Sequence, residues 1–407
     1  MSLLEFGESV HEKAQKLAGE AKDANQIAKI LCDQDPQGHN YGIGIMLDGA
    51  GQAMGSSSVL LEYAAKELDS SREGNYMNSA KWMNELKESV LKWQRIPEQH
   101  WDHFILALPS DAGTGTVKTG VELAALMNPN LRQIGVEKLG WPAYKAIARV
   151  SRMEVAEFDS DAICAGTDIL PIYQAGPMNT TGRVRSESVI RERAKSAEKQ
   201  NLSVVLDRAY PGFEFARLVE THSYDAILAK SYELQIQPFI DEGVSFSITL
   251  SPTKAFVTFA LRPCGMLLVF CPDKSRITEV NNLTSMIVRA RGSSFENPIS
   301  RAFVKAMVQD RARLETEHQE ALKRLSNAES TWRRLVQGTP IEDLYSENYA
   351  GLFRNPSARP DAAVHIYNEH IYPVFAQGRC RQNVTGIPDD EQLAMRHVAV
   401  FAEQCSL

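Results

Sequence analysis

The chain has 407 residues and carries 44 Lys+Arg against 51 Asp+Glu, which gives a net charge of −7. A surface that binds duplex nucleic acid needs a basic stripe, and no run of Lys or Arg supplies one, so no nucleic-acid partner is expected. No stretch of about 18 consecutive apolar residues is present, which argues against a transmembrane helix and a membrane partner. At about 100–200 residues per domain, the length predicts two or three domains.

The N-terminal residues and the cysteines predict a cytoplasmic protein. The first residues lack the charged, apolar and small-residue regions that make up a secretory signal. The six cysteines include no C-x-x-C pair and are too sparse for a disulfide framework. Free thiols are typical of a reducing compartment, so we expect the cytoplasm.

The first predicted elements are helical. A segment of about 40 residues ends at the turn residues 35–38, and residues 56–95 again have helix-like periodicity. From about 100 to 275, short apolar runs typical of strands alternate with helix-like segments. The strand-like runs are 103–108, 162–164 with 169–173, 202–206, 225–228, 246–250 and 266–270, and the helix-like segments are 115–127, 142–151, 186–200 and 212–221. This alternation predicts βαβ units and a mostly parallel, buried sheet.

Residues 299–336 predict one long charged helix. Apolar residues recur there at steps of 3, 4, 7 and 8, which places them in one stripe, and Gly338 is the expected stop. We therefore expect an α/β protein in which residues 51–300 form a large domain around a mostly parallel sheet. Residues 1–50 form an N-terminal arm and part of a smaller α/β domain, and residues 301–407 form the interdomain helix and the rest of that domain.

Reactive side chains follow several of the predicted strands. Asp207 ends one strand, Tyr210 lies three residues later, and Ser251 and Lys254 follow another strand. In open α/β sheets, ligands bind at the carboxyl ends of the strands. The sequence therefore predicts that these side chains share one site.

The chemistry of this set favours one cofactor. Gly113 and Thr114 lie in a Gly/Thr-rich helix start, whose free N–H groups suit a dianionic phosphate, and Ser251 and Arg262 complete the cradle. A partly desolvated lysine is a nucleophile toward an aldehyde. An aspartate beneath a pyridine nitrogen keeps that nitrogen protonated. Pyridoxal 5′-phosphate fits this combination better than any other cofactor, and no metal site is predicted.

The order of the motifs resembles that of the fold-type I pyridoxal-phosphate aminotransferases, in particular the aspartate/aromatic group, over roughly residues 38–400. The block Ser251-Pro-Thr-Lys254 with Arg262, and the block Asp207-Arg-Ala-Tyr210, resemble the cofactor segments of that family. The resemblance implies that Lys254 bonds to the cofactor aldehyde and carries protons, and that Asp207 contacts the pyridine nitrogen.

Further cofactor roles are implied by the same resemblance. Tyr210 and Asn179, which begins the segment Asn179-Thr-Thr-Gly182, are implied at the phenolic oxygen of the cofactor. Gly113 and Thr114 resemble the phosphate turn. Trp141, in Gly140-Trp141-Pro-Ala-Tyr-Lys, resembles the tryptophan that stacks on the cofactor ring.

The resemblance also implies a substrate site and a homodimer with active sites at the subunit interface. Arg381, in Arg381-Gln-Asn-Val-Thr-Gly386, resembles the arginine that holds the substrate α-carboxylate, and Gly44 resembles a loop that closes over substrate, beside Trp141 and Asn179. Tyr76 resembles a tyrosine that reaches the phosphate of the neighbouring subunit. Arg291 resembles the arginine that selects dicarboxylates across the dimer, and Arg289 competes for that role.

The implied reaction moves an amino group from an amino acid, either aspartate or glutamate or an aromatic one, to a 2-oxo acid such as 2-oxoglutarate. Two alternatives stay open. The same cofactor supports β-elimination and decarboxylation, because only the orientation of the substrate selects the bond that breaks. A divergent, non-catalytic paralogue with the same fold is the second alternative.

Overall fold

The protein, seen here in a computed structural model, is described for residues 10–20, 22–71, 79–108, 111–292 and 296–407. It divides into two compact units: unit 1 comprises residues 1–54, 177–184 and 322–407, and unit 2 comprises 55–176 and 185–321. The change from unit 2 to unit 1 at residues 321–322 falls within the segment expected as the interdomain helix. Residues 177–184, expected within the large domain, belong to unit 1.

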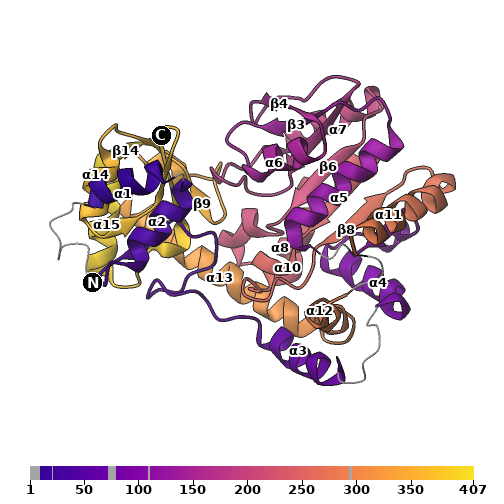
Figure 1. Cartoon of the computed structure of the whole chain (residues 1–407), viewed down its shortest axis with the longest axis horizontal. Coiled ribbons are helices and arrows are strands. Elements are labelled where there is room, and N and C mark those ends of the chain that lie inside the picture. The colour runs from indigo at the N-terminus through magenta and orange to yellow at the C-terminus, as the bar shows by residue number, and fades with distance from the viewer. Residues whose placement is uncertain (1–9, 21, 72–78, 109–110, 293–295) are drawn as a thin grey trace. The chain divides into compact units, whose positions relative to one another are not determined.

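Unit 2 is built on a seven-stranded sheet with the order β2-β8-β7-β6-β5-β3-β4. Figure 1 labels β3, β4, β6 and β8 of this sheet. The strands are β2 (Phe104–Ala107), β3 (Gln133–Glu137), β4 (Glu154–Phe158), β5 (Ile169–Gln174), β6 (Val204–Arg208), β7 (Phe246–Leu250) and β8 (Met266–Phe270). Strand β8 is antiparallel to both of its neighbours, whereas the pairs from β7 to β4 are parallel. The prediction of a mostly parallel sheet in an α/β fold is confirmed.

Helices cover both faces of this sheet. They are α3 (Ser58–Ser70), α4 (Met83–Trp93), α5 (Ala112–Met127), α6 (Ala143–Val150), α7 (Glu187–Lys199), α8 (Tyr224–Gln235), α9 (Gln237–Asp241), α10 (Pro252–Ala255), α11 (Ile277–Gly292) and α12 (Pro298–Gln309). Because side chains alternate along a strand, Val205 of β6 packs with α5 and α6, whereas Val204 and Leu206 pack with α7, α8 and α12 on the other face. Both faces are apolar, as expected for strands buried on both sides.

Unit 1 is a smaller α/β unit. Its elements are α1 (Val10–Gly19), α2 (Ala24–Asp33), α14 (Ala362–Asn368), α15 (Glu391–Gln404) and the short strands β1 (His39–Asn40), β9 (Phe353–Arg354), β10 (Ser357–Ala358), β11 (Ile371–Tyr372), β12 (Val374–Ala376), β13 (Arg379–Asn383) and β14 (Cys405–Ser406). Strand β1 pairs with β11 in parallel, and β13 pairs with β9, β10 and β12 in antiparallel fashion. The N-terminal arm is thus part of the same unit as the C-terminal segment.

The single helix expected over 299–336 is two helices, α12 and α13 (Arg311–Leu335). Asp310 separates them, with φ −133° and ψ 29°, and its carboxylate accepts a hydrogen bond from Tyr63 of α3 at 3.1 Å. Phe303 and Met307 before the break and Leu314 after it are buried in the same core of unit 2. The apolar stripe therefore continues across the break, which is why the periodicity did not reveal it.

Two predicted strand segments are wrong, and two strands of the large sheet were missed. Residues 162–164 lie between β4 and β5, outside any helix or strand. Residues 225–228 lie in helix α8, which begins after Ser223, whose side chain accepts a hydrogen bond from the Ala226 N–H at 3.2 Å. Ser223 is thus an N-cap, which satisfies one of the free donors at a helix start. Strands β3 and β4 at one edge of the sheet were not predicted. Across the described ranges, no helix is long and apolar enough to span a membrane.

Candidate active site

Asp207 and Lys254 lie at the carboxyl ends of neighbouring parallel strands. Strand β6 pairs with β7 so that Asp207 is opposite Thr249. Lys254 lies in the short helix α10, which begins two residues after β7, and its side chain is half-buried with Nζ 4.7 Å from the centroid of the Phe259 ring. The sheet register therefore places the acid and the amine at the same edge.

The Asp207 carboxylate is held by two uncharged donors. The Tyr144 hydroxyl donates to Oδ2, and the Thr249 hydroxyl donates to Oδ1 at 3.1 Å. Burial raises the pKa of Asp207 to about 6, although both hydrogen bonds act to lower it. Desolvation disfavours the charged form of a carboxyl group that has no cation beside it. A protonated ring nitrogen is a counter-ion that this carboxylate can accept.

Two aromatic residues follow strands β3 and β6 of this sheet. Trp141 is half-buried just before α6, and its ring meets that of Tyr144 edge-to-face, with centroids 5.3 Å apart at 88°. Tyr210 is buried two residues after β6, where its ring lies 5.5 Å from that of Phe213. Both aromatic residues expected at the cofactor therefore follow strands of the same sheet edge.

The first turn of α5 lies against the lysine segment. A Cβ atom added to Gly113 would be 3.0 Å from Cβ of Ser251, so the helix start and the residue after β7 are in direct contact. Asp111, at the N-cap position, makes no side-chain capping hydrogen bond to the helix. The N–H groups of the first turn, including that of the exposed residue Thr114, therefore offer donors for an anion.

Arg262 lies in the loop between α10 and β8. It adopts a left-handed conformation with φ +37°, its N–H donates to the Thr258 carbonyl at 2.8 Å, and its side chain is exposed. Three residues later, the backbone of Gly265 lies so close to α5 that an added Cβ would be 1.7 Å from Oγ1 of Thr116 and 2.1 Å from the Ala112 carbonyl oxygen. This loop is therefore fixed against the same first turn of α5.

Arg291 is engaged within its own unit. From the last turn of α11, it donates to the Gly115 carbonyl at 3.0 Å and forms an ion pair with Glu122 of α5 at 2.6 Å. These contacts tie α11 to α5 just behind the helix start. The role of Arg291 in selecting dicarboxylates, like that of its competitor Arg289, stays a prediction.

In unit 1, Arg381 and the loop around Gly44 are brought together. Arg381 donates to the Gly42 carbonyl at 2.8 Å and to Asn25 Oδ1 at 2.6 Å. The Asn383 amide donates to the carbonyls of Ile43 and Ile45, on either side of Gly44. Two residues of β13 therefore hold this loop.

The segment that begins at Asn179 also belongs to unit 1. Gly182 has φ +78°, and an added Cβ would be 2.3 Å from the Phe353 carbonyl oxygen, so only glycine allows this approach. The Arg381 guanidinium lies 4.8 Å from the centroid of the Phe353 ring. Phe353 thus links the Asn179 turn to the predicted carboxylate-binding arginine. Tyr76 lies outside the described residues.

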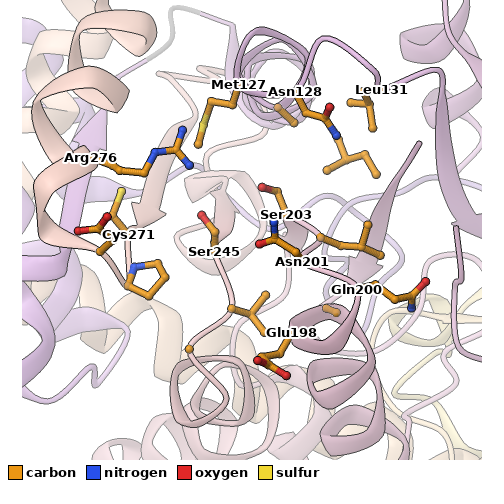
Figure 2. Close-up of a pocket in the computed structure, with 18 of the residues that line it drawn as sticks. Met127, Asn128, Leu131, Glu198, Gln200, Asn201, Ser203, Ser245, Cys271 and Arg276 are labelled. Carbon is orange, nitrogen blue, oxygen red and sulfur yellow. The ribbon is translucent and has the colours of Figure 1, made fainter. Parts of the chain in front are cut away.

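A separate hollow of about 600 Å³ lies in unit 2 (Figure 2). Its lining includes Ser203, Ser245 and Arg276, and the two serines directly precede β6 and β7. The hollow is therefore at the amino ends of these strands, whereas Asp207 and Lys254 follow the carboxyl ends. None of the predicted site residues lines it.

Three residues of the site were missed by sequence reasoning. Tyr144 and Thr249 bind the Asp207 carboxylate, and Gly265 contacts the first turn of α5. Tyr144 is in the Trp141 motif, one helical turn after the tryptophan, so the local spacing was a usable signal. Thr249 and Gly265 had no such signal, because their roles follow from the strand register and from the approach of a loop.

Comparisons with known proteins give the family. The sequence profile described as "Aminotransferase class I and II" matches residues 49–350. No curated protein sequence matches the chain.

Several solved structures are similar in fold. The aromatic-amino-acid aminotransferase from Burkholderia pseudomallei, covalently bound to pyridoxal phosphate, is 16% identical with a TM-score of 0.74, and the match covers 98% of this chain and 99% of that chain. The broad specificity aminotransferase from Leishmania mexicana (17% identity, TM-score 0.74, 97% and 98% covered) and the cytoplasmic aspartate aminotransferase from Giardia lamblia (17%, 0.74, 94% and 96%) are similar as well.

The donor set fits the cofactor of this family: a half-buried carboxylate that accepts hydrogen bonds from two hydroxyl groups, a half-buried lysine in the short helix after the next strand, and a helix start in contact with Ser251. The chain belongs to the class I and II aminotransferases, which depend on pyridoxal phosphate.

Proposed function

We propose that this enzyme transfers an amino group from aspartate, glutamate or an aromatic amino acid to a 2-oxo acid such as 2-oxoglutarate. The observation that carries the proposal is the sheet register, which puts Asp207 and Lys254 at the same edge of adjacent strands. The open start of α5 against Ser251 supports a phosphate site beside them.

When bound, pyridoxal phosphate supplies an aldehyde for amines and a ring that withdraws electrons from the substrate Cα. In this proposal, Lys254 would hold the cofactor through its amine and would carry a proton between the substrate Cα and the cofactor carbon that bears the aldehyde. Asp207 keeps the ring nitrogen protonated. Tyr210 and Asn179 would bind the phenolic oxygen, and Trp141 would stack on the ring.

The phosphate is bound by the N–H groups of Gly113 and Thr114 together with Ser251 and Arg262. A dianion is stabilised at a helix start by the free N–H groups and by the helix dipole. Arg262 adds a charged donor whose planar fork suits phosphate oxygens. The approach of Gly265 to the same turn supports this placement of the loop that carries Arg262.

The substrate α-carboxylate is bound by Arg381. Its contacts with Asn25, Gly42 and the Phe353 ring support this role, because they fix the orientation of the guanidinium. Gly44 lies in the loop that Asn383 holds, next to this arginine. Selection between a carboxylate and an aromatic side chain is assigned to Arg291 or Arg289 of the neighbouring subunit.

The proposal includes a cytoplasmic homodimer in which Tyr76 reaches the phosphate of the neighbouring subunit. Light scattering of the purified protein measures its mass against 45.3 kDa for one chain. A monomer that binds cofactor and turns over would contradict the dimeric site.

The test combines a spectrum with product analysis. The protein is purified with pyridoxal phosphate, and each of a panel of amino acids is added without a 2-oxo acid. We expect the visible band of the bound cofactor to bleach, and one 2-oxo acid to form per cofactor. Lys254→Ala should abolish both changes, whereas Lys230→Ala, at an exposed lysine of α8, should keep them.

Other outcomes contradict the proposal in distinct ways. Release of ammonia or carbon dioxide in place of a simple 2-oxo acid would indicate a lyase or a decarboxylase. A cofactor band that no amino acid alters would indicate a non-catalytic protein.

A further inference from the structure

Tyr144 links two parts of the site that sequence reasoning treated separately. Its hydroxyl donates to Oδ2 of Asp207, and its ring lies edge-to-face against Trp141, 5.3 Å between centroids. Its side chain is 1% exposed, and its N–H donates to the Trp141 carbonyl at 3.3 Å. The residue is thus buried and fixed between the acid and the tryptophan.

Asp207 accepts a second hydrogen bond, which again comes from an uncharged hydroxyl group. The Thr249 hydroxyl donates to Oδ1, so each carboxylate oxygen has one neutral donor. No ion pair joins Asp207 to a lysine, arginine or histidine among the residues that the structure describes. A carboxylate that accepts a hydrogen bond at each oxygen has a fixed orientation, and within the described part of the chain no cation offsets its charge.

We propose that Tyr144, with Thr249, is a positioning residue that reserves the charge of Asp207 for the ring nitrogen of the cofactor. This inference rests on the proposed role of Asp207. A cation at the same place would compete with a protonated ring for the carboxylate, whereas a hydroxyl donor orients the carboxylate and leaves a lone pair for the N–H of the ring.

The hydroxyl of Tyr144 is suited to this role at neutral pH. Burial and the neighbouring Asp207 raise its pKa well above the ordinary value of 10, so the group stays a proton donor. Without it, the charged form of Asp207 loses one of its two stabilising hydrogen bonds. The pKa of Asp207 then rises, so the proton between its carboxylate and the ring nitrogen shifts toward the carboxylate.

The experiment compares two ligands that differ at one atom. One is pyridoxal phosphate, and the other is its carbocyclic analogue, in which a CH group replaces the ring nitrogen. The dissociation constants of both are measured by tryptophan fluorescence, and their ratio reports the contact between Asp207 and the nitrogen. Damage to the phosphate turn or to the general fold alters both constants alike and leaves the ratio unchanged.

Tyr144→Phe removes the hydroxyl and keeps the ring against Trp141. We expect it to reduce the preference for pyridoxal phosphate over the analogue by about tenfold, as for the loss of one hydrogen bond to a charged group. Thr249→Val should act in the same direction, and Thr249→Ser should restore the preference. Tyr224→Phe is the matched control, because it removes a buried hydroxyl that contacts His318 at 2.7 Å and not Asp207.

The outcomes separate this inference from the proposed function. Asp207→Ala should abolish the preference; if it does not, the assignment of Asp207 to the ring nitrogen fails. If Asp207→Ala abolishes the preference and both Tyr144→Phe and Thr249→Val keep it, only the positioning role of Tyr144 and Thr249 is wrong. That role is also excluded if these two variants weaken the binding of both ligands equally.

Discussion

Replacement of Gly265 by alanine tests whether the loop before β8 fixes the start of α5. The added Cβ would be 1.7 Å from Oγ1 of Thr116 and 2.1 Å from the Ala112 carbonyl oxygen. Thr116 is itself held in place, because its hydroxyl donates to that same carbonyl at 2.9 Å. A rotation of one side chain therefore cannot relieve the clash, and the backbone must move.

The size of the effect follows from these distances. Non-bonded carbon and oxygen atoms are at van der Waals contact at about 3.0–3.5 Å, so the loop and the helix start must separate by about 1–2 Å. Overpacking of this kind costs about 1–3 kcal/mol of stability. The same movement displaces the N–H groups that are proposed to bind phosphate, and each lost hydrogen bond to a charged group costs about 1.5–3 kcal/mol. We therefore expect the Kd for pyridoxal phosphate to rise by at least about tenfold.

The assay is thermal unfolding of the cofactor-free protein together with cofactor titration followed by fluorescence. Gly120→Ala is the matched control in the same helix, because its added Cβ would have its nearest neighbour at 3.5 Å, an ordinary contact. Alanine is favoured over glycine inside a helix by about 1 kcal/mol, so this variant should have a higher Tm and an unchanged Kd. A Gly265→Ala protein with wild-type Tm and wild-type Kd would show that the loop before β8 does not fix the start of α5.

Three further variants test other parts of the site. The pKa of Asp207 is about 6 in the folded, cofactor-free protein and 3.8 ordinarily, so its bound proton stabilises the fold at low pH. The free energy of unfolding, measured by urea titration relative to Asp207→Asn, should therefore fall as the pH rises from 4 to 6. A difference between the two proteins that does not change with pH would contradict this. Arg381→Lys should raise KM for amino acids by about tenfold or more, because lysine lacks the planar guanidinium that binds both oxygens of a carboxylate. The Kd of the cofactor should stay unchanged. An unchanged KM in steady-state assays would exclude a substrate role for Arg381. Arg291→Gln breaks the ion pair with Glu122 and should lower Tm by a few degrees in a thermal scan. If Arg291 also selects dicarboxylates, this variant should raise KM for aspartate and leave KM for phenylalanine unchanged. A KM for aspartate equal to that of the wild type would refute that role.

The places of Asp207 and Lys254 after two strands could be predicted because they depend on local sequence. Asp207 and Lys254 each follow an apolar run, and the runs at 246–250 and 266–270 are strands β7 and β8 with those bounds. A strand buried on both faces is a continuous apolar run, and the residues that follow it reach the sheet edge in any such fold. This prediction failed at 225–228, where a short apolar run begins a helix. Four residues are too few to distinguish the two-residue period of a strand from the 3.6-residue period of a helix.

The amino-acid sequence by itself determined the strand-end motifs, the helix start that offers an anion site and the α/β class, since each depends on neighbours within one element. Only the tertiary structure decided that Tyr144 binds Asp207, 63 residues away, that Gly265 contacts the first turn of α5, and that Asp310 interrupts the long helix opposite Tyr63. These contacts depend on strand register and on where separate helices settle against the sheet. Hydrophobic periodicity shows which face of a helix or strand is buried, but it does not show which polar side chains from distant parts of the sequence will contact each other.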